Sequence, residues 1–247
     1  MSGHSKWATI KRKKAANDSK RGKLFAKLIR AVEVAARQGG GDVAGNAPLA
    51  AAVAKARAHA VPVDNIDRAI ARATGSADGA NYEEIWYEGY GPGGIAVYVQ
   101  VLTDNRNRAA SDVRTAFTRN NGSLGEPGSV GYLFESKGFI EVEGDEDEVL
   151  GAALEAGAED VRPGEDVFEV ITAPSDLAPV QKALETAGLA VQNAEVTQLP
   201  KSTIPVDATS AGKVLRLVDV LEDLDDVQAV YANYEIGDEL LAQLAAE

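Results

Sequence analysis

The sequence predicts an α+β protein with an N-terminal three-helix bundle and a basic arm, followed by two ferredoxin-like α/β domains, one inserted in the other. Apolar residues recur at helical spacing near the N-terminus and alternate as in strands after residue 82. Lysine and arginine are concentrated at the N-terminal end. We expect a basic arm over 1–20, a helical domain over 21–78, a discontinuous α/β domain over 79–131 and 204–247, and an inserted βαββαβ domain over 132–203.

Charge divides the chain into two unequal parts. Residues 1–37 hold 11 of the 25 lysine and arginine residues and two acids, so their net charge is +9. The whole chain carries −13, which leaves −22 for the other 210 residues. Because an acidic body repels phosphates, any polyanion is expected to meet the basic end.

Composition excludes several classes of protein. Cysteine is absent, so disulfides, thiolate zinc sites and cysteine nucleophiles are excluded. The sequence has no run of 18 apolar residues and no apolar segment of the secretory type at its basic N-terminus, so we expect no membrane association. These features are typical of a cytoplasmic protein.

The arm carries the densest group of cations. Lys11, Arg12, Lys13 and Lys14 are contiguous, and Lys6 adjoins Trp7. A segment with four adjacent like charges is not expected to fold alone, and its cations are suited to phosphates while Trp7 can stack on a base. The alternative is a solvated tail with Trp7 packed against the body.

The first helix is expected to begin near Asp18 or Ser19 and to end near Gly39. Its apolar stripe comprises Leu24, Phe25, Leu28, Ile29, Val32, Ala35 and Ala36. The opposite face is predicted to show a basic ridge outward, although an ordinary solvated face or a membrane-surface helix would share the pattern. The nucleic-acid-binding candidates in this helix are Lys20, Arg21, Lys23, Lys27, Arg30 and Arg37.

Two further helices complete the expected bundle. Asn46 is a suitable cap for a helix that ends at Val61-Pro62, and Asp64 is a suitable cap for the next. The proline in the break and the lack of a helix rich in Asn, Gln and Arg argue against a helix-turn-helix that reads bases.

After residue 82 the pattern becomes that of strands. Segments 82–90 and 95–103 alternate, and a G-x-G-x-x-G match over 89–94 lies between them. A strand follows this match where a dinucleotide site needs a helix, so we expect a hairpin connection. A helix over about 104–121 follows, and its Arg108, Arg114 and Arg119 are candidates for a secondary contact or isolated surface cations.

The inserted domain has the strand and helix order βαββαβ. The expected segments are 139–143, 145–156, 159–162, 166–172, 175–186 and 190–199. The acids Asp145 to Glu148 fall at a helix N-terminus, where the helix dipole favours them, so a solvated first turn is expected in place of a metal site. A helix after Asp207 and a strand over 228–236 then complete the discontinuous domain.

Catalytic motifs are absent from the sequence. His4 and His59 are the only histidines, and no nucleophile elbow, Walker loop or metal-ligand spacing is present. We therefore predict no enzyme activity, no cofactor and no metal.

Four segments resemble the YebC family of bacterial regulators, whose mitochondrial relatives activate translation. They are GHSKWATIKRKKAANDSKRGKLFAKLIR at 3–30, EGYGPGG at 88–94, LTDNRNR at 102–108 and GSLGEPGSVGYLFESKG at 122–138. The resemblance implies three domains and a cytoplasmic, DNA-binding transcriptional regulator. Some members resemble ribosome-associated translation factors that act at proline-rich stretches.

The sequence hypothesis is thus a non-catalytic regulator of gene expression that binds nucleic acid through its basic arm and first helix. The partner is DNA, or in the alternative ribosomal or transfer RNA on the ribosome, for which phosphates and shape suffice. A third hypothesis is a sensor or enzyme that uses a pocket between its α/β domains. We expect a monomer.

Overall fold

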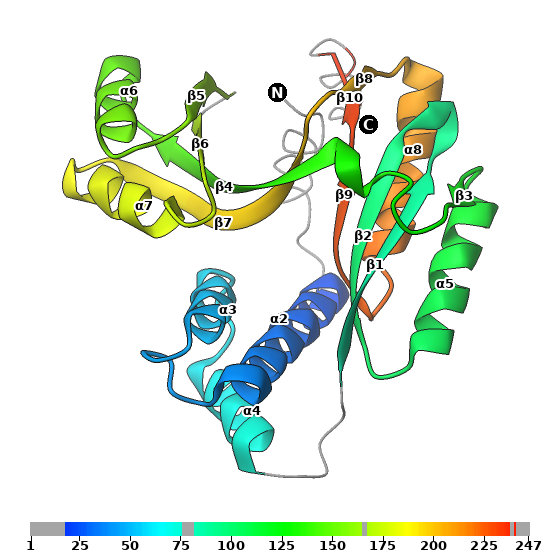
Figure 1. Ribbon diagram of the computed structural model, residues 1–247, viewed down its shortest axis with the longest axis horizontal. Helices are drawn as coiled ribbons and strands as arrows, with labels where there is room; N and C mark the ends of the chain where they lie inside the picture. The colour runs from blue at the N-terminus through cyan, green and yellow to red at the C-terminus, as the bar shows by residue number, and fades with distance from the viewer. Residues whose placement is uncertain (1–17, 76–81, 165–166, 238–239, 241–247) are drawn as a thin grey trace. The chain divides into compact units, whose positions relative to one another are not determined.

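Three helices near the N-terminus pack together (Figure 1), and a core of small and branched apolar residues lies between them. The computed structural model describes residues 18–75, 82–164, 167–237 and 240. The helices are α2 (Asp18–Gly39), α3 (Ala47–Ala58) and α4 (Val63–Gly75). The bounds of α2 confirm the prediction from the caps and the apolar spacing.

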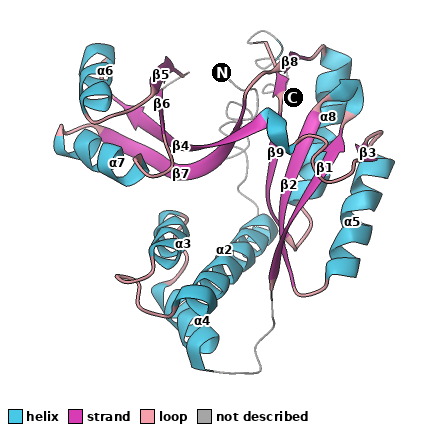
Figure 2. Ribbon diagram, in the orientation of Figure 1, coloured by secondary structure: helices cyan, strands magenta, loops and turns pink. Residues whose placement is uncertain are grey.

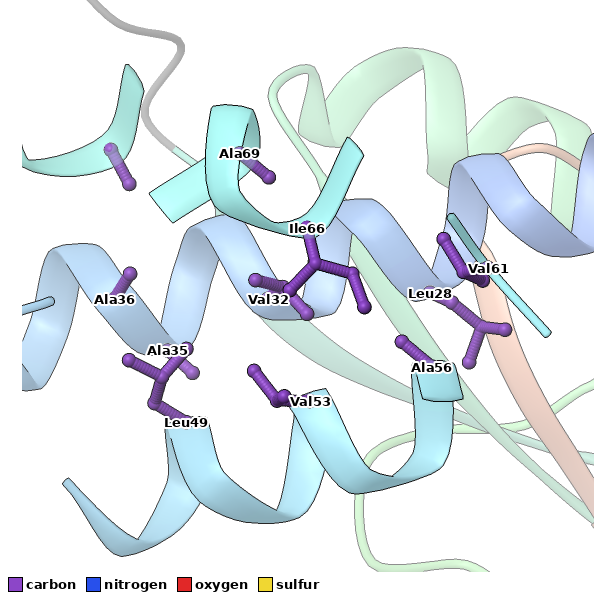
Figure 3. Close-up of a cluster of buried hydrophobic side chains, with 11 residues drawn as sticks. Leu28, Val32, Ala35, Ala36, Leu49, Val53, Ala56, Val61, Ile66 and Ala69 are labelled. Atoms are coloured by element: carbon purple, nitrogen blue, oxygen red, sulfur yellow. The ribbon is translucent and has the colours of Figure 1, made fainter. Parts of the chain in front are cut away.

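The helical core is made by one stripe from each helix (Figure 3). α2 contributes its inner face, which packs against α3 and α4. Its Leu24 differs from the prediction, since 38% of this residue is exposed and the core begins one turn later. The buried members are Leu28, Val32, Ala35, Ala36, Leu49, Val53, Ala56, Val61, Ile66, Ala69 and Ala73.

A single buried amide joins the end of α2 to the start of α3. The Asn46 side chain accepts a hydrogen bond from the Leu49 amide at 3.2 Å, as expected of a helix cap. Its Nδ2 also donates to the carbonyl oxygens of Ala35 and Gly40, both at 2.8 Å. Asn46 is 4% exposed, so these bonds satisfy a buried polar group and fix the turn between the two helices.

The first sheet has the strand order β3-β1-β2-β9. Its central strands β1 (Glu83–Tyr90) and β2 (Ala96–Thr103) form an antiparallel hairpin across the short 3₁₀ turn η1 (Pro92–Gly94). This confirms the hairpin predicted at the glycine-rich segment. The other elements are α5 (Arg106–Arg119), β3 (Ser123–Leu124), α8 (Ala208–Glu222) and β9 (Val227–Ala232), with α5 packed against the sheet and α8.

The second sheet has the antiparallel order β5-β6-β4-β7, which is the order of a ferredoxin-like fold (Figure 2). β4 begins at Phe134, five residues before the predicted start, because it extends along β7 to the pair Phe134 and Pro200. The elements are η2 (Gly131–Leu133), β4 (Phe134–Glu143), α6 (Glu146–Glu155), β5 (Asp160–Pro163), β6 (Phe168–Thr172), α7 (Leu177–Thr186) and β7 (Ala190–Pro200).

The chain divides into two compact units. The larger unit comprises residues 18–130 and 208–230, and therefore holds the helical core and most of the first sheet. The smaller unit comprises 131–207 and 231–237, with the second sheet and a two-stranded ribbon of β8 (Ile204–Pro205) and β10 (Tyr234–Glu235). Within the described ranges, no helix combines the length and the apolar character needed to cross a bilayer.

Candidate nucleic-acid interface

The predicted contact residues fall into two groups. Those of the arm lie outside the described residues: Lys6, Trp7, Lys11, Arg12, Lys13 and Lys14. Lys20 belongs to α2, but its side chain is not among those described. The structure therefore places the candidates of α2 from Arg21 onward.

Three cations of α2 lie along one face at positions i, i+4 and i+7. This spacing brings Lys23, Lys27 and Arg30 onto one side of the helix. We call them the cationic stripe. The Lys23 ammonium donates to the carbonyl oxygen of Asp223 at 3.1 Å, and the Lys27 ammonium donates to that of Glu222 at 2.5 Å. The stripe therefore contacts the C-terminal end of α8 within the larger unit.

The end of α8 needs cations that its own sequence does not supply. The last carbonyl groups of a helix have no partner within the helix, and the helix dipole places partial negative charge there. α8 has no basic residue in its last turn. Four acids over 222–226 add negative charge at the same end. The cationic stripe satisfies the carbonyl groups and offsets the charge.

Arg30 makes the most connections of the stripe. One nitrogen of its guanidinium lies 3.1 Å from the carbonyl oxygen of Leu102, 3.0 Å from that of Asp225 and 2.9 Å from the Asp226 carboxylate. The guanidinium also lies 5.2 Å from the centre of the Tyr82 ring, within the range of a cation–π interaction. Arg30 thus joins α2 to the end of β2 and to the turn between α8 and β9.

Asp226 is the buried acceptor for this group. It is 7% exposed and accepts from Thr103 Oγ1 at 2.9 Å and from Arg108 Nη2 at 2.8 Å, as well as from Arg30. Burial by itself raises the pKa of the Asp226 carboxyl, but hydrogen bonds from Arg108 and Thr103 and the two nearby guanidinium charges outweigh it and hold this pKa below its usual value. Asp226 is therefore a carboxylate at neutral pH.

Lys27 is the cation most affected by burial. Loss of contact with water disfavours its charged form and lowers its pKa from 10.5 to about 8, although Glu222, Asp223 and Asp225 act in the opposite direction. Lys27 is half-buried, whereas Lys23 is exposed. The stripe therefore runs from a solvated end at Lys23 to an enclosed end at Arg30.

The outward basic ridge predicted from the sequence differs from the observed arrangement. Lys23, Lys27 and Arg30 face another part of the larger unit, because the periodicity of a helix gives the direction of a face but not what lies opposite. Arg21 is exposed, with its guanidinium 5.3 Å from the centre of the Phe25 ring. Arg37 is half-buried in the last turn of α2.

The three arginines of α5 that were candidates for a secondary contact differ in their surroundings. Arg108 binds Asp226 and, at 2.8 Å, Asp104, so it belongs to the same charge network as Arg30. Arg114 and Arg119 are exposed on the outer face of the helix. Sequence reasoning missed Asp226 and Thr103. The acidic residues 222–226, after the helix predicted to follow Asp207, are a signal from which this region could have been found.

A cavity borders this network within the larger unit. Its charged lining combines Lys23, Arg30, Arg108, Asp112, Asp223, Asp225 and Asp226. Within this lining, the cations Arg30 and Arg108 are already paired with the Asp226 carboxylate. Within the ranges that the structure describes, no three histidine or acidic residues converge to hold a metal ion.

Comparison with known proteins places the chain among regulators. Residues 5–76 match the TACO1/YebC protein N-terminal domain, and residues 82–234 match the TACO1/YebC second and third domain. A protein of Beutenbergia cavernae named "Probable transcriptional regulatory protein" is 59% identical over 99% of both chains. A protein of the same name from Acidothermus cellulolyticus is 57% identical over 99% of this chain and 100% of its own. The class defined in this way is that of regulatory proteins with a helical domain ahead of two domains that combine helices with a sheet.

A solved structure has the same fold. The crystal structure of a conserved hypothetical protein from Aquifex aeolicus superposes with a TM-score of 0.82 at 48% identity, over 90% of this chain and 93% of that one. The chain belongs to the TACO1/YebC family. The resemblance inferred from its sequence segments is thereby confirmed.

Proposed function

We propose that this protein is a nucleic-acid-binding regulator of gene expression, a transcriptional regulator that contacts DNA through its arm and helical domain. The separation of charge carries the proposal. Residues 1–75 hold fifteen basic and five acidic residues, for a net charge of +10, whereas residues 76–247 carry −23. A polyanion is attracted to the first part and repelled by the second.

Two further observations support this function. The relatives from Beutenbergia and Acidothermus carry the name of transcriptional regulators. The helical domain also exposes cations on α3 and α4, namely Lys55, Arg57, Arg68 and Arg72. Arg68 donates to its neighbours Asp64 and Asn65, and Arg72 pairs with Glu33 of α2. These side chains extend the basic region beyond the arm.

The test measures how binding depends on salt. The probes are a labelled 24-base-pair DNA duplex and a labelled single-stranded RNA of 24 nucleotides, read by fluorescence anisotropy between 50 and 300 mM KCl. Each phosphate contact contributes about −0.9 to the log–log slope on duplex DNA and about −0.7 on a single strand. Changing Lys11, Arg12, Lys13 and Lys14 to glutamine should flatten the slope by about three.

The control removes the same charge from the acidic part of the chain. Lys182, Lys201, Lys213 and Arg216 are exposed, and their change to glutamine should leave the slope unchanged. An equal loss of slope in both variants would show that net charge, and not the arm, governs binding, and would contradict the proposal.

A second candidate is a ribosome-associated translation factor. It is favoured by the exposed positions of α3, which hold Lys55 and Arg57 among alanines and carry no Asn or Gln. Such a face suits phosphates and not base edges. Sedimentation of a lysate through sucrose separates the two functions. Migration with ribosomes that is lost after RNase supports the translation factor, and DNase-sensitive retention on the nucleoid supports the DNA regulator.

A further inference from the structure

The cations best arranged to follow a phosphate backbone are already bound within the protein. Lys23, Lys27 and Arg30 share one face of α2, and each donates to an acceptor at the α8 end. A nucleic acid can reach this face fully only if these hydrogen bonds are given up. The contact therefore opposes binding by the face of α2 that the sequence marks as basic.

The partner of the stripe offers acceptors of the kind that a polyanion offers. It consists of the carbonyl oxygens of Glu222, Asp223 and Asp225 and the carboxylate of Asp226, on a segment with four acids in five residues. Phosphate oxygens present the same combination of negative charge and hydrogen-bond acceptors. The two ligands are thus alternatives for one set of donors.

The stripe can part from α8 without loss of the helical core. The core residues of α2 lie on a different face and pack only against α3 and α4 within the buried cluster. Lys23 and Lys27 each reach α8 through one hydrogen bond from a flexible side chain to a backbone oxygen. The helical domain therefore keeps its own packing when the stripe changes partner.

We propose that residues 222–226 form an autoinhibitory clasp, which holds the cationic stripe of α2 until a nucleic acid displaces it. This inference rests on the proposed function and adds its regulation. Binding by the intact protein then includes the cost of opening the clasp. Salt weakens the clasp as well as the complex, so the salt dependence of the intact protein is shallower than its number of cations implies.

Two variants weaken the clasp without altering α2, because they remove negative charge from residues 222–226 while the backbone acceptors remain. Asp226→Asn removes the charge that Arg30 contacts but retains the shape of the side chain. The double variant Asp223→Asn/Asp225→Asn changes only exposed side chains and so keeps the test valid if Asp226→Asn impairs folding. The matched control is Asp147→Asn/Glu148→Gln in the first turn of α6, which removes the same charge as the double variant from exposed positions of the smaller unit.

The measurement is anisotropy with the same duplex and single-stranded probes. Both clasp variants should bind at least about fivefold more tightly than the control at 50 mM KCl, and their slope on duplex DNA should be steeper by up to about 2.7 for three released cations. Hydrogen exchange gives a second readout, because the Leu102 amide donates to the Asp226 carbonyl at 2.8 Å. In the wild-type protein, addition of the duplex should increase exchange over 99–103 and 222–227.

The outcomes separate this inference from the function on which it rests. If wild-type protein and clasp variants bind alike, or if exchange over 222–227 falls on binding, the clasp is refuted and the proposed function stands. If only the clasp variants bind, both are supported. If no form binds either probe, the proposed function fails, and the inhibitory role of residues 222–226 fails with it.

Discussion

Two acidic runs of similar composition lie at opposite ends of two helices. Asp145 to Glu148 begin α6, whereas residues 222–226 follow the last turn of α8. In α6 the Asp145 carboxylate accepts from the Asp147 amide at 3.0 Å, and the remaining acids face water in the first turn. At the end of α8 the acids lie beside carbonyl groups that also carry partial negative charge. The cations that contact this end come from α2, almost 200 residues away in sequence.

The position in the helix, and not the composition, decides what an acidic run does. At an N-terminus, acids bind free amide groups and complement the dipole, so the run is complete in itself. At a C-terminus, acids add to the partial negative charge and require an external cation. The first run is therefore a local stabilising feature, and the second is a binding site for another segment.

The largest effect is expected from substitution of Asp226, the buried acid of the second run. Asp226→Ala removes the shared acceptor of Arg30, Arg108 and Thr103, and it leaves the half-buried Arg30 and the exposed Arg108 without their carboxylate. We expect the free energy of unfolding to fall by about 2–4 kcal/mol. The measurement is equilibrium urea denaturation. The control Asp147→Ala, at an exposed first-turn position of the other run, should change the free energy of unfolding by less than about 0.5 kcal/mol. Equal losses in the two variants would contradict the difference between the two acidic runs.

The second effect is a dependence of stability on pH that originates at Lys27. Its pKa is about 8 in the folded protein and 10.5 in the reference state. Between these values the unfolded chain retains a proton that the folded protein has released, so unfolding takes up a proton and stability rises with pH. The groups that face Lys27 are Glu222, Asp223, Asp225 and Lys23.

A difference measurement isolates this residue from the other titrating groups. The free energy of unfolding of the wild-type protein, relative to Lys27→Met, should increase by about 3 kcal/mol between pH 7 and pH 10.5, since each pKa unit corresponds to about 1.4 kcal/mol. Urea denaturation at intervals of half a pH unit provides the curves. Parallel curves for the two proteins would show that Lys27 is not enclosed by the clasp.

The smallest effect concerns the first run. Asp145→Ala removes the cap of α6 and should cost about 1 kcal/mol, whereas Asp145→Asn retains an acceptor and should cost a few tenths of that amount. Thermal denaturation followed by circular dichroism measures both. A cost for Asp145→Asn as large as that for Asp145→Ala would mean that charge, and not the capping hydrogen bond, makes the run favourable.

Local features of the fold were predictable because they depend on neighbours in sequence. The bounds of α2, the cap at Asn46, the hairpin at the glycine-rich segment and the ferredoxin-like strand order all follow from periodicity and caps. The early start of β4 at Phe134 was not predicted, because it depends on pairing with the last residues of β7. The exposure of Leu24 likewise depends on where the partner helices end.

The candidate site was predicted only in part. Helical spacing correctly placed Lys23, Lys27 and Arg30 on one face opposite the apolar stripe, but the segment that meets this face lies about 195 residues further along the chain. Asp226 gave no local signal of its burial, since it reads as one more acid in a polar turn. Its role depends on Thr103 and Arg108, which the fold brings to it.

The order of the three cations along α2 has a mechanical consequence. A pull on the chain ahead of Asp18 loads the exposed contact of Lys23 first, then that of Lys27, and only then the several bonds of Arg30. Contacts that are loaded one after another break one at a time, and they break at a lower force than contacts that share the load. Tension at the N-terminus would therefore detach α2 progressively, with Arg30 as the last point of attachment.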